Sequence, residues 1–402
     1  MALNQQTVPT QERARPPFWL LATITMGASI GIHLMVPALP VAASDLGVSA
    51  GQMQLAISVY LLTLAIGQLI WGPVSDSVGR RRALVAGTTL FTVGGLAAAS
   101  APTLELLLVA RVVQGLGAAC GMSLGRAIIR DTSEGVEMIR LLALLALVVL
   151  LSPGLAPMLG GAIAHGLGWR ALLGLLGAVG LFSLWMTVRR LPETCPSIKP
   201  FDARRIAADY GSLVRDLRFT GLALGTAGLN TAAFAFLAVA PVLLTREMGL
   251  GLTEVGLCSG LVMMGLALGN ALTSTLVRRI APHRLAAVGL LLAVAGALAL
   301  LALEMGQQLN LTNMLIALVT LNCGAGMSSP VMTARAYTFR PTQAGTAAGV
   351  QGCTLMVMAA VSGSLVSPDS DPAYSCAVVM LSVVVASCGC IALATHLARR
   401  RG

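Results

Sequence analysis

The stretch WGPVSDSVGRRR, Trp71 to Arg82, decides how the rest of the chain is organised. It is polar, contains two glycines and ends in three consecutive arginines, and it stands between long apolar runs near 54–71 and 83–100. Apolar runs of this length form membrane-spanning helices, and arginines clustered beside such a helix stay in the cytoplasm. The stretch is therefore predicted to be a cytoplasmic turn that orients the protein.

The composition is that of an integral membrane protein. Of the 402 residues, 56% are hydrophobic and 10% are charged, and the mean hydropathy is +0.84. A soluble domain carries about 25% charged residues. The net charge of +10 could suggest nucleic-acid binding. Its distribution along the chain instead fits membrane topology, so we expect no nucleic-acid partner.

Twelve apolar runs can be counted along the chain. Most have the length of about 20 residues that crosses a bilayer as a helix, and in lipid every backbone polar group must be satisfied within such a segment. The fold class is therefore all-α, with twelve spans. The runs lie near 18–39, 54–71, 83–100, 104–125, 139–165, 169–188, 218–244, 253–276, 283–304, 311–332, 345–366 and 374–396.

The basic residues predict the orientation. With the N-terminus inside, 23 of the 26 lysines and arginines fall in the two termini or in every second loop. The exceptions are Arg111, Arg170 and Arg246. This alternation predicts that both termini, the tail 1–17 and the basic tail 397–402, are cytoplasmic.

The longest polar stretch, 189–217, divides the chain into two predicted six-helix bundles, 18–188 and 218–396. Within it Ile206, Tyr210 and Leu213 recur at helical spacing among charged residues, which predicts an amphipathic helix on the inner membrane surface. A solvated linker with a helical tendency is the alternative. The second half weakly echoes the first, because GNALTSTLVRR at Gly269 to Arg279 follows the eighth run as the opening stretch follows the second. Two repeated bundles with a site between them are typical of transporters.

Five short stretches, GPVSDSVGRR, RVVQG, GRAIIRD, SPGLAPMLGG and PALP, resemble motifs of the major facilitator superfamily. GPVSDSVGRR at Gly72 to Arg81 is similar to the family pattern G-x-x-x-D-R-x-G-R-R, with Ser77 where an arginine is usual. RVVQG from Arg111 resembles the family's R-x-x-Q-G. GRAIIRD from Gly125, SPGLAPMLGG from Ser152 and the earlier PALP from Pro37 resemble its bicyclomycin and chloramphenicol resistance branch of drug:proton antiporters.

The resemblance implies a conformational latch in the first motif, made by Gly72, Asp76, Gly79, Arg80 and Arg81. Glycine permits a tight turn and close approach of backbones, and a carboxylate can cap a helix or pair with arginines in one transporter state only. A solvated turn is the alternative.

The fourth motif implies an antiporter-type helix. Prolines remove backbone donors and glycines remove side chains, so the helix should be bent and closely packed, and it could limit leakage. A merely kinked structural helix is the alternative. The residues are Pro153, Gly154, Pro157, Gly160 and Gly161.

Two ionisable residues lie deep in predicted spans, where such groups are functional candidates. At 1.5 Å per residue, His33 lies about 22 Å from the inner end of its span and Arg111 about 10 Å from the outer end of its own, so they reach similar depth. The resemblance implies an acidic residue where His33 stands. Arg111 stays protonated, and a neutral histidine supplies no negative charge. Arg111 therefore needs a counter-charge from elsewhere or several carbonyl acceptors. We expect a neutral His33 and a net positive cavity that favours neutral or anionic substrates.

His33 could also couple transport to protons, because histidine titrates near physiological pH. The alternatives are a packing histidine and, for Arg111, a structural role. Further polar or aromatic groups within spans are cavity candidates, although helix–helix hydrogen bonding explains each of them equally well. They are Tyr60, Gln114, Asn230, Phe234, Asn270 and Asn322.

No metal site or cofactor is predicted. The 18 methionines and His33 could suggest copper(I), but His33 and Met35 project to different helix faces. No G-x-x-x-x-G-K-[ST] stretch occurs, so an ion gradient rather than ATP should supply the energy.

The predicted function is secondary active export of small organic molecules in exchange for protons, by a monomer in the bacterial inner membrane. An importer or facilitator of a metal ion or anionic metabolite is the alternative within transport. A membrane-embedded receptor or enzyme is the alternative from another class. An enzyme is disfavoured because no His, Asp and Glu cluster lies within the spans.

Overall fold

The computed structural model describes residues 16–195, 198, 202–250, 252–339, 343–365 and 372–399. Every regular element in this part of the chain is helical. The elements are α1 (Phe18–His33), the 3₁₀ turn Val36–Ala38, α2 (Leu39–Leu46), α3 (Ala50–Val78), α4 (Arg80–Ala99), α5 (Leu104–Thr132), α6 (Gly135–Leu167), α7 (Trp169–Arg190), α8 (Ala203–Arg215), α9 (Leu217–Val242), the π-helical turn Leu243–Glu247, α10 (Leu252–Leu276), α11 (Pro282–Met305), α12 (Leu311–Thr338), α13 (Ala344–Ser364) and α14 (Pro372–Arg399).

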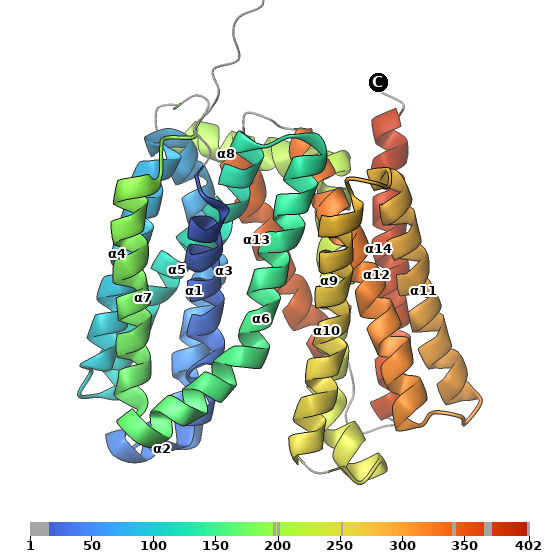
Figure 1. Ribbon diagram of the computed structural model, residues 1–402, viewed down its shortest axis with the longest axis horizontal. Coiled ribbons are helices and arrows are strands. Elements are labelled where there is room, and N and C mark those ends of the chain that lie inside the picture. Colours follow the sequence, from blue (N-terminus) through green and yellow to red (C-terminus); the bar gives the residue numbers. More distant parts are fainter. Residues whose placement is uncertain are drawn as a thin grey trace, which may run out of the picture.

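The helices form two groups. Helices α1 to α7 pack mainly among themselves, as do α9 to α14, and the pairs α3–α13 and α6–α10 join the groups. Helix α8 lies across one end of the assembly, where α14 also ends (Figure 1). We call this end the linker side. Helices α3 and α5 end there, and α13 begins there.

Eleven helices within the described residues are long and apolar enough to cross a membrane. They correspond to eleven of the twelve predicted runs. The remaining run, 345–366, forms α13, a helix of 21 residues that is outside this set. The all-helical membrane fold is thus confirmed, and the count of twelve spans stays a prediction.

The first predicted span, 18–39, is not one continuous helix. Helix α1 ends at His33, and the chain continues through the 3₁₀ turn into α2, which runs on to Leu46. The break has a local cause, because Pro37 and Pro40 cannot donate the backbone hydrogen bonds that an uninterrupted helix requires.

The stretch 71–82 is not the turn that its composition predicts. It is helical up to Val78, and α4 begins at Arg80, so a single glycine, Gly79 with φ of 94°, separates the two helices. Pro73 lies inside α3 and has no N–H to offer the carbonyl of Leu69 one turn earlier. That carbonyl instead accepts the hydroxyl of Tyr210 in α8. The helix tolerates its proline because the linker helix satisfies the freed group.

Candidate functional site

Arg111 is fully buried where α1, α3 and α5 meet. Its Nε donates to the carbonyl oxygen of Ala56 at 3.1 Å and its Nη1 to Oε1 of Gln114 at 2.7 Å. Its Nη2 donates to the carbonyl oxygen of Gly31 at 2.9 Å, and its guanidinium carbon lies 4.1 Å from the centre of the Tyr60 ring. In the described part of the chain no carboxylate pairs with Arg111. Carbonyl dipoles and an aromatic face stabilise the cation instead.

The contact with Gly31 caps α1 at its break. The N–H of Leu34 makes the last helical hydrogen bond of α1, and the next carbonyl along the chain, that of Gly31, accepts from Arg111. A cation is favourable there because the C-terminus of a helix carries partial negative charge. The Tyr60 hydroxyl donates to the carbonyl of Ala28 at 2.8 Å, and a Cβ on Gly31 would lie 2.5 Å from that hydroxyl. Two side chains of other helices therefore hold the end of α1 in place.

His33 is the last residue of α1 and is half-buried. His33 and Arg111 were predicted to reach similar depth, and Arg111 binds the carbonyl of Gly31, two residues before His33, but no hydrogen bond joins the two side chains among the described residues. Among the described residues the imidazole has no hydrogen-bond partner, and no three His, Cys, Asp or Glu side chains lie together as metal ligands would. The coupling role of His33 stays a prediction.

The second group of helices contains a polar network between α9, α12 and α13. Asn230 donates to the carbonyl of Thr226 at 2.7 Å and to Oγ of Ser329 at 2.6 Å. Gln351 donates to Oγ1 of Thr226 at 3.1 Å and to Oγ1 of Thr333 at 2.8 Å. Sequence reasoning identified Asn230 but missed Gln351, although an amide within an apolar run was the same signal.

The other cavity candidates of this half differ in exposure. Asn270 and Asn322 are buried where α10 packs on α12, and each donates to the carbonyl four residues earlier in its own helix, at 2.9 Å and 2.8 Å. A Cβ on Gly326 would lie 2.9 Å from the backbone nitrogen of Asn270, so the packing is tight. This placement favours a helix–helix role for the two asparagines. Phe234 in α9 is 42% exposed and remains a cavity candidate.

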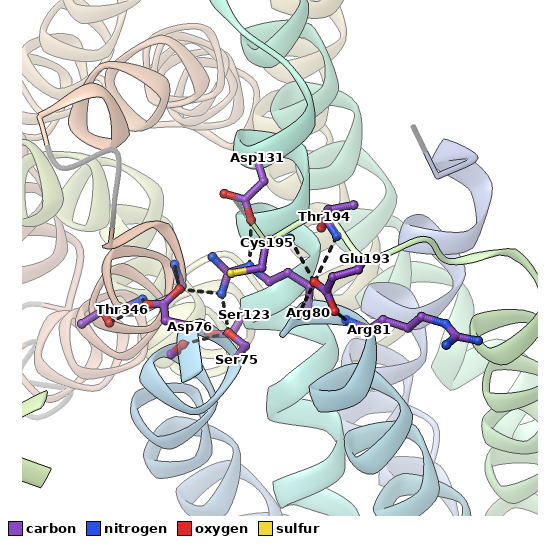
Figure 2. Close-up of polar contacts among 12 residues, drawn as sticks. Ser75, Asp76, Arg80, Arg81, Ser123, Asp131, Glu193, Thr194, Cys195 and Thr346 are labelled. Atoms are coloured by element: carbon purple, nitrogen blue, oxygen red, sulfur yellow. Dashed lines mark hydrogen bonds and ion pairs between the residues drawn. The ribbon is translucent and has the colours of Figure 1, made fainter. Parts of the chain in front are cut away.

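The latch candidates Asp76 and Arg80 meet at the linker side, where the Arg80 side chain lies between the carboxylates of Asp76 and Asp131 (Figure 2). Arg80 Nη1 lies 2.6 Å from Oδ1 of Asp76, and Arg80 Nε lies 2.7 Å from Oδ2 of Asp131. The same Nη1 donates to Oγ of Ser75 at 2.6 Å, and only 1% of the Arg80 side chain is exposed. The two carboxylates compensate the buried cation, which would otherwise be strongly unfavourable.

Asp76 also binds the other group of helices. Its Oδ1 accepts the N–H of Gly345 at 3.3 Å, and its Oδ2 accepts the N–H of Thr346 at 3.2 Å and the hydroxyl of Thr346 at 3.0 Å. These groups belong to the first turn of α13, where backbone N–H groups lack helical partners and the helix dipole favours a negative charge. One carboxylate thus caps a helix of the opposite group while it holds Arg80.

Glycine is required on both sides of this contact. A Cβ on Gly72 would lie 2.6 Å from the carbonyl oxygen of Gly345, and a Cβ on Gly345 would lie 2.5 Å from Nη1 of Arg80. Side chains at either position would keep α3 and α13 apart.

Glu193, which sequence reasoning missed, caps the beginning of α4. Its carboxylate accepts the N–H of Arg80 at 2.8 Å and the N–H of Arg81 at 3.3 Å. Gly79 precedes α4 with a positive φ, and a Cβ there would lie 2.4 Å from Glu193. Arg81 donates to the carbonyl of Val188 at the end of α7. Glu193 lies three residues after the end of α7, and the sequence alone gave no signal of a partner more than 100 positions away.

Two arginines of the GRAIIRD stretch add further ties between the groups. Arg126 Nη2 donates to Oε1 of Gln68 at 2.9 Å and to the carbonyl of Ala348 in α13 at 3.4 Å. Arg130 Nε donates to the carbonyl of Tyr337 in α12 at 3.3 Å. Both ties lie at the linker side, as does the Asp76 contact.

The predicted antiporter-type helix is α6, which bends in its lower half toward α2 (Figure 1). A Cβ on Gly160 would lie 2.2 Å from the carbonyl oxygen of Leu34, so this glycine lets α6 approach the break after α1. A Cβ on Gly161 would meet no atom of the described residues within 4 Å. The side chains of Pro153 and Pro157, and residue Gly154, lie outside the part described at this level.

Comparison with known proteins identifies the family over most of the chain. The sequence profile of the Major Facilitator Superfamily matches residues 20–364. The chain belongs to this superfamily. Related members include the uncharacterised MFS-type transporter YdgK of Bacillus subtilis, 34% identical over 58% of this chain and 59% of that protein. The chloramphenicol resistance protein CraA of Acinetobacter baumannii is 28% identical over 81% of this chain and 79% of that protein.

These matches confirm the predicted resemblance, and this superfamily member is a multi-pass protein of the bacterial inner membrane. In the YdgK comparison the chain spans about three fifths of the relative's length. The fold also matches the crystal structure of the Escherichia coli fucose:proton symporter FucP, with a TM-score of 0.73 at 17% identity, over 94% of this chain and 98% of that one. At this identity the likeness concerns the fold alone.

Proposed function

We propose that this superfamily member is a secondary active transporter, not an enzyme, and that it exports small organic molecules in exchange for protons. The observation that carries the proposal is that Asp76 of the first group caps α13 of the second group. Beside this contact, Arg126 and Arg130 of the first group donate hydrogen bonds to carbonyls of α13 and α12. All are hydrogen bonds at one end of the assembly, so the two groups can separate there without disrupting either core. Rocking of two bundles about a midplane site is the transport mechanism that such an arrangement serves.

In this proposal the linker side is cytoplasmic, and α13 is the twelfth span. The arginine distribution supports this orientation, since Arg80, Arg81 and Arg82 stand at the linker side. Both termini are then cytoplasmic. The two bundles comprise residues 18–188 and 218–396, and a single chain supplies both sides of the site.

The linker 189–217 acts as a brace when the linker side is closed. Tyr210 of α8 donates to Leu69 of α3, and Asp209 accepts the Nε2 of Gln343, just before α13, at 2.7 Å. Adjacent residues of one helix thus bind both bundles. Leu213 is fully buried and anchors α8 against them.

The transported molecules are proposed to be neutral or anionic. Deep in the first bundle Arg111 supplies a positive charge with no carboxylate partner in the described residues, and in the second bundle Asn230 and Gln351 supply neutral polar groups. A cationic drug would meet repulsion from Arg111. The name of the relative CraA makes chloramphenicol the first compound to test.

Proteoliposomes with an acidic lumen and a trapped pH dye test export. Chloramphenicol added outside should enter in exchange for protons, so the lumen pH should rise faster than in protein-free liposomes. Organic anions and copper are tested in parallel. A fall in lumen pH would indicate symport, and entry of every compound at the protein-free rate would contradict the transporter proposal.

The same assay tests His33 as the coupling group. In His33→Ala, chloramphenicol binding should persist while the rise in lumen pH is lost. His396→Ala, which changes an exposed histidine near the end of α14, is the matched control. Normal proton exchange in His33→Ala would remove His33 from the mechanism.

A further inference from the structure

Three buried hydrogen-bond donors at the linker side have no acceptor in the described part of the chain. They are Nε2 of Gln68, Nε of Arg126 and the hydroxyl of Tyr337. Arg126 Nη2 donates to Oε1 of Gln68 at 2.9 Å, and Arg130, one turn further along α5, donates to the backbone carbonyl of Tyr337 at 3.3 Å. Gln68 and Tyr337 are 0% and 1% exposed. An unpaired buried donor is costly, so three of them at this end of the assembly favour the binding of an acceptor.

Both groups of helices are needed to build this cluster, which we call the Arg126 site. Gln68 and Arg126 come from α3 and α5, whereas Tyr337 comes from α12. Helix α13 closes the site with glycines: a Cβ on Gly352 would lie 1.8 Å from Oε1 of Gln68 and 2.4 Å from Nη2 of Arg126. The residues of the site therefore come from both groups of helices, so separation of the groups at the linker side would divide the site.

The charge at the Arg126 site is positive and uncompensated. The nearby carboxylates, Asp76 and Asp131, are both committed to Arg80. No carboxylate lies within ion-pair distance of Arg126 among the described residues. An arginine that stays protonated in a half-buried position favours a negatively charged ligand.

We propose that the Arg126 site binds a small anion, and that it does so only in the closed-linker state. The donor set suits a halide or a carboxylate group. The anion could be free in solution, or it could be the acidic group of a transported molecule. A ligand that binds one state alone shifts the equilibrium toward that state, so the anion would hold the linker side closed. The state preference rests on the proposed transport cycle, whereas the binding does not.

Binding is tested on the purified full-length protein in detergent. Chloride should broaden its own NMR line on binding and should raise the thermal unfolding midpoint relative to sodium methanesulfonate at equal ionic strength. At ten times its Kd the expected rise is about 2 °C. Arg126→Gln should abolish both effects and Tyr337→Phe should weaken them. Arg215→Gln, at an exposed arginine of α8, should leave them unchanged.

Gln68→Glu gives a test whose expected result would not arise if the residues of the Arg126 site had a purely structural role. The new carboxylate would stand beside Arg126 in place of the anion, so this variant should be at least as stable as the wild type without chloride and should not respond to chloride. It also keeps the proposal testable if Arg126→Gln does not fold. Equal midpoints in chloride, acetate and methanesulfonate, or an unchanged anion response in Gln68→Glu, would overturn the proposal.

Acetate distinguishes the two sources of the anion. Stabilisation by both acetate and chloride assigns a free small anion, while stabilisation by acetate alone assigns the carboxylate of a transported molecule. Failure of both salts to stabilise the protein would overturn the site, even if proteoliposomes export chloramphenicol. Conversely, binding of the anion would stand if no export were found.

Discussion

Asp76 and Thr346 are 270 positions apart in the chain, yet the Asp76 carboxylate accepts both the N–H and the hydroxyl of Thr346, at 3.2 Å and 3.0 Å. This pair joins the two groups of helices at the linker side. The same carboxylate holds the buried Arg80 at 2.6 Å. Opening of the linker side must therefore break the hydrogen bonds between Asp76 and α13. The ion pair between Arg80 and Asp131 lies within the first group of helices and can stay intact.

Asp76→Asn should favour the open-linker state. Hydrogen bonds to a charged group contribute about 1.5–3 kcal/mol, and loss of the charge weakens all three that reach α13. We expect labelling of Cys353, the half-buried cysteine of α13, by a water-soluble maleimide to accelerate at least about ten-fold. The measurement uses a variant in which Cys353 is the single cysteine. Ser77→Ala, one position away, is the control, and an unchanged rate in Asp76→Asn would contradict the latch.

Arg80→Gln should destabilise the protein strongly. It leaves two carboxylates, Asp76 and Asp131, in a buried site without their cation. Removal of one partner from a buried ion pair costs about 3–5 kcal/mol. Thermal unfolding should show a clearly lowered midpoint for Arg80→Gln and an unchanged one for Arg82→Gln, which alters an exposed arginine of the same run. Similar midpoints for the two variants would mean that the ion pairs of Arg80 contribute little to the stability of the folded protein.

Substitutions of Tyr210 and Pro73 should have coupled effects on the free energy of unfolding, because both residues determine how the carbonyl of Leu69 is satisfied. Burial raises the pKa of Tyr210, so the phenol keeps the hydrogen that it donates to Leu69. Tyr210→Phe should cost about 0.5–1.5 kcal/mol in the wild type. In the Pro73→Ala background the cost should fall, because the substituted alanine would supply the N–H that the carbonyl of Leu69 lacks. A double-mutant cycle on the unfolding midpoint measures this coupling, and additive effects would refute it.

Gly31→Ala should impair transport without loss of the folded protein. The added Cβ would lie 2.5 Å from the Tyr60 hydroxyl and would displace the groups that cap α1, including Arg111. We expect chloramphenicol transport to fall about ten-fold or more while the protein still inserts and purifies, since a displacement of about 1 Å in a site can cost about 100-fold. Gly389→Ala in α14, whose added Cβ would meet no described atom within 4 Å, is the matched control. Equal transport by both variants would show that the break after α1 tolerates adjustment.

Much of the architecture could be predicted because it depends on local composition. Runs of about 20 apolar residues predict spanning helices wherever they fold, and eleven of the twelve predicted runs meet the criteria for a span. The amphipathic pattern of Ile206, Tyr210 and Leu213 predicted α8 for the same reason. The stretch 71–78 was wrongly predicted as a turn, because glycine, proline and polar residues are turn formers unless tertiary contacts satisfy the backbone, as Tyr210 does for Leu69.

The sequence by itself determined the membrane class, the family and the identity of the charged groups that matter, because motif spacing and hydropathy are properties of neighbouring residues. It placed Arg111 at the depth of His33 and made Asp76 and Arg80 latch candidates. Only the tertiary structure decided their partners: the carbonyl of Gly31 for Arg111, and the first turn of α13 for Asp76. Such contacts depend on the packing of helices far apart in the chain, and one sequence carries no local signal of that packing.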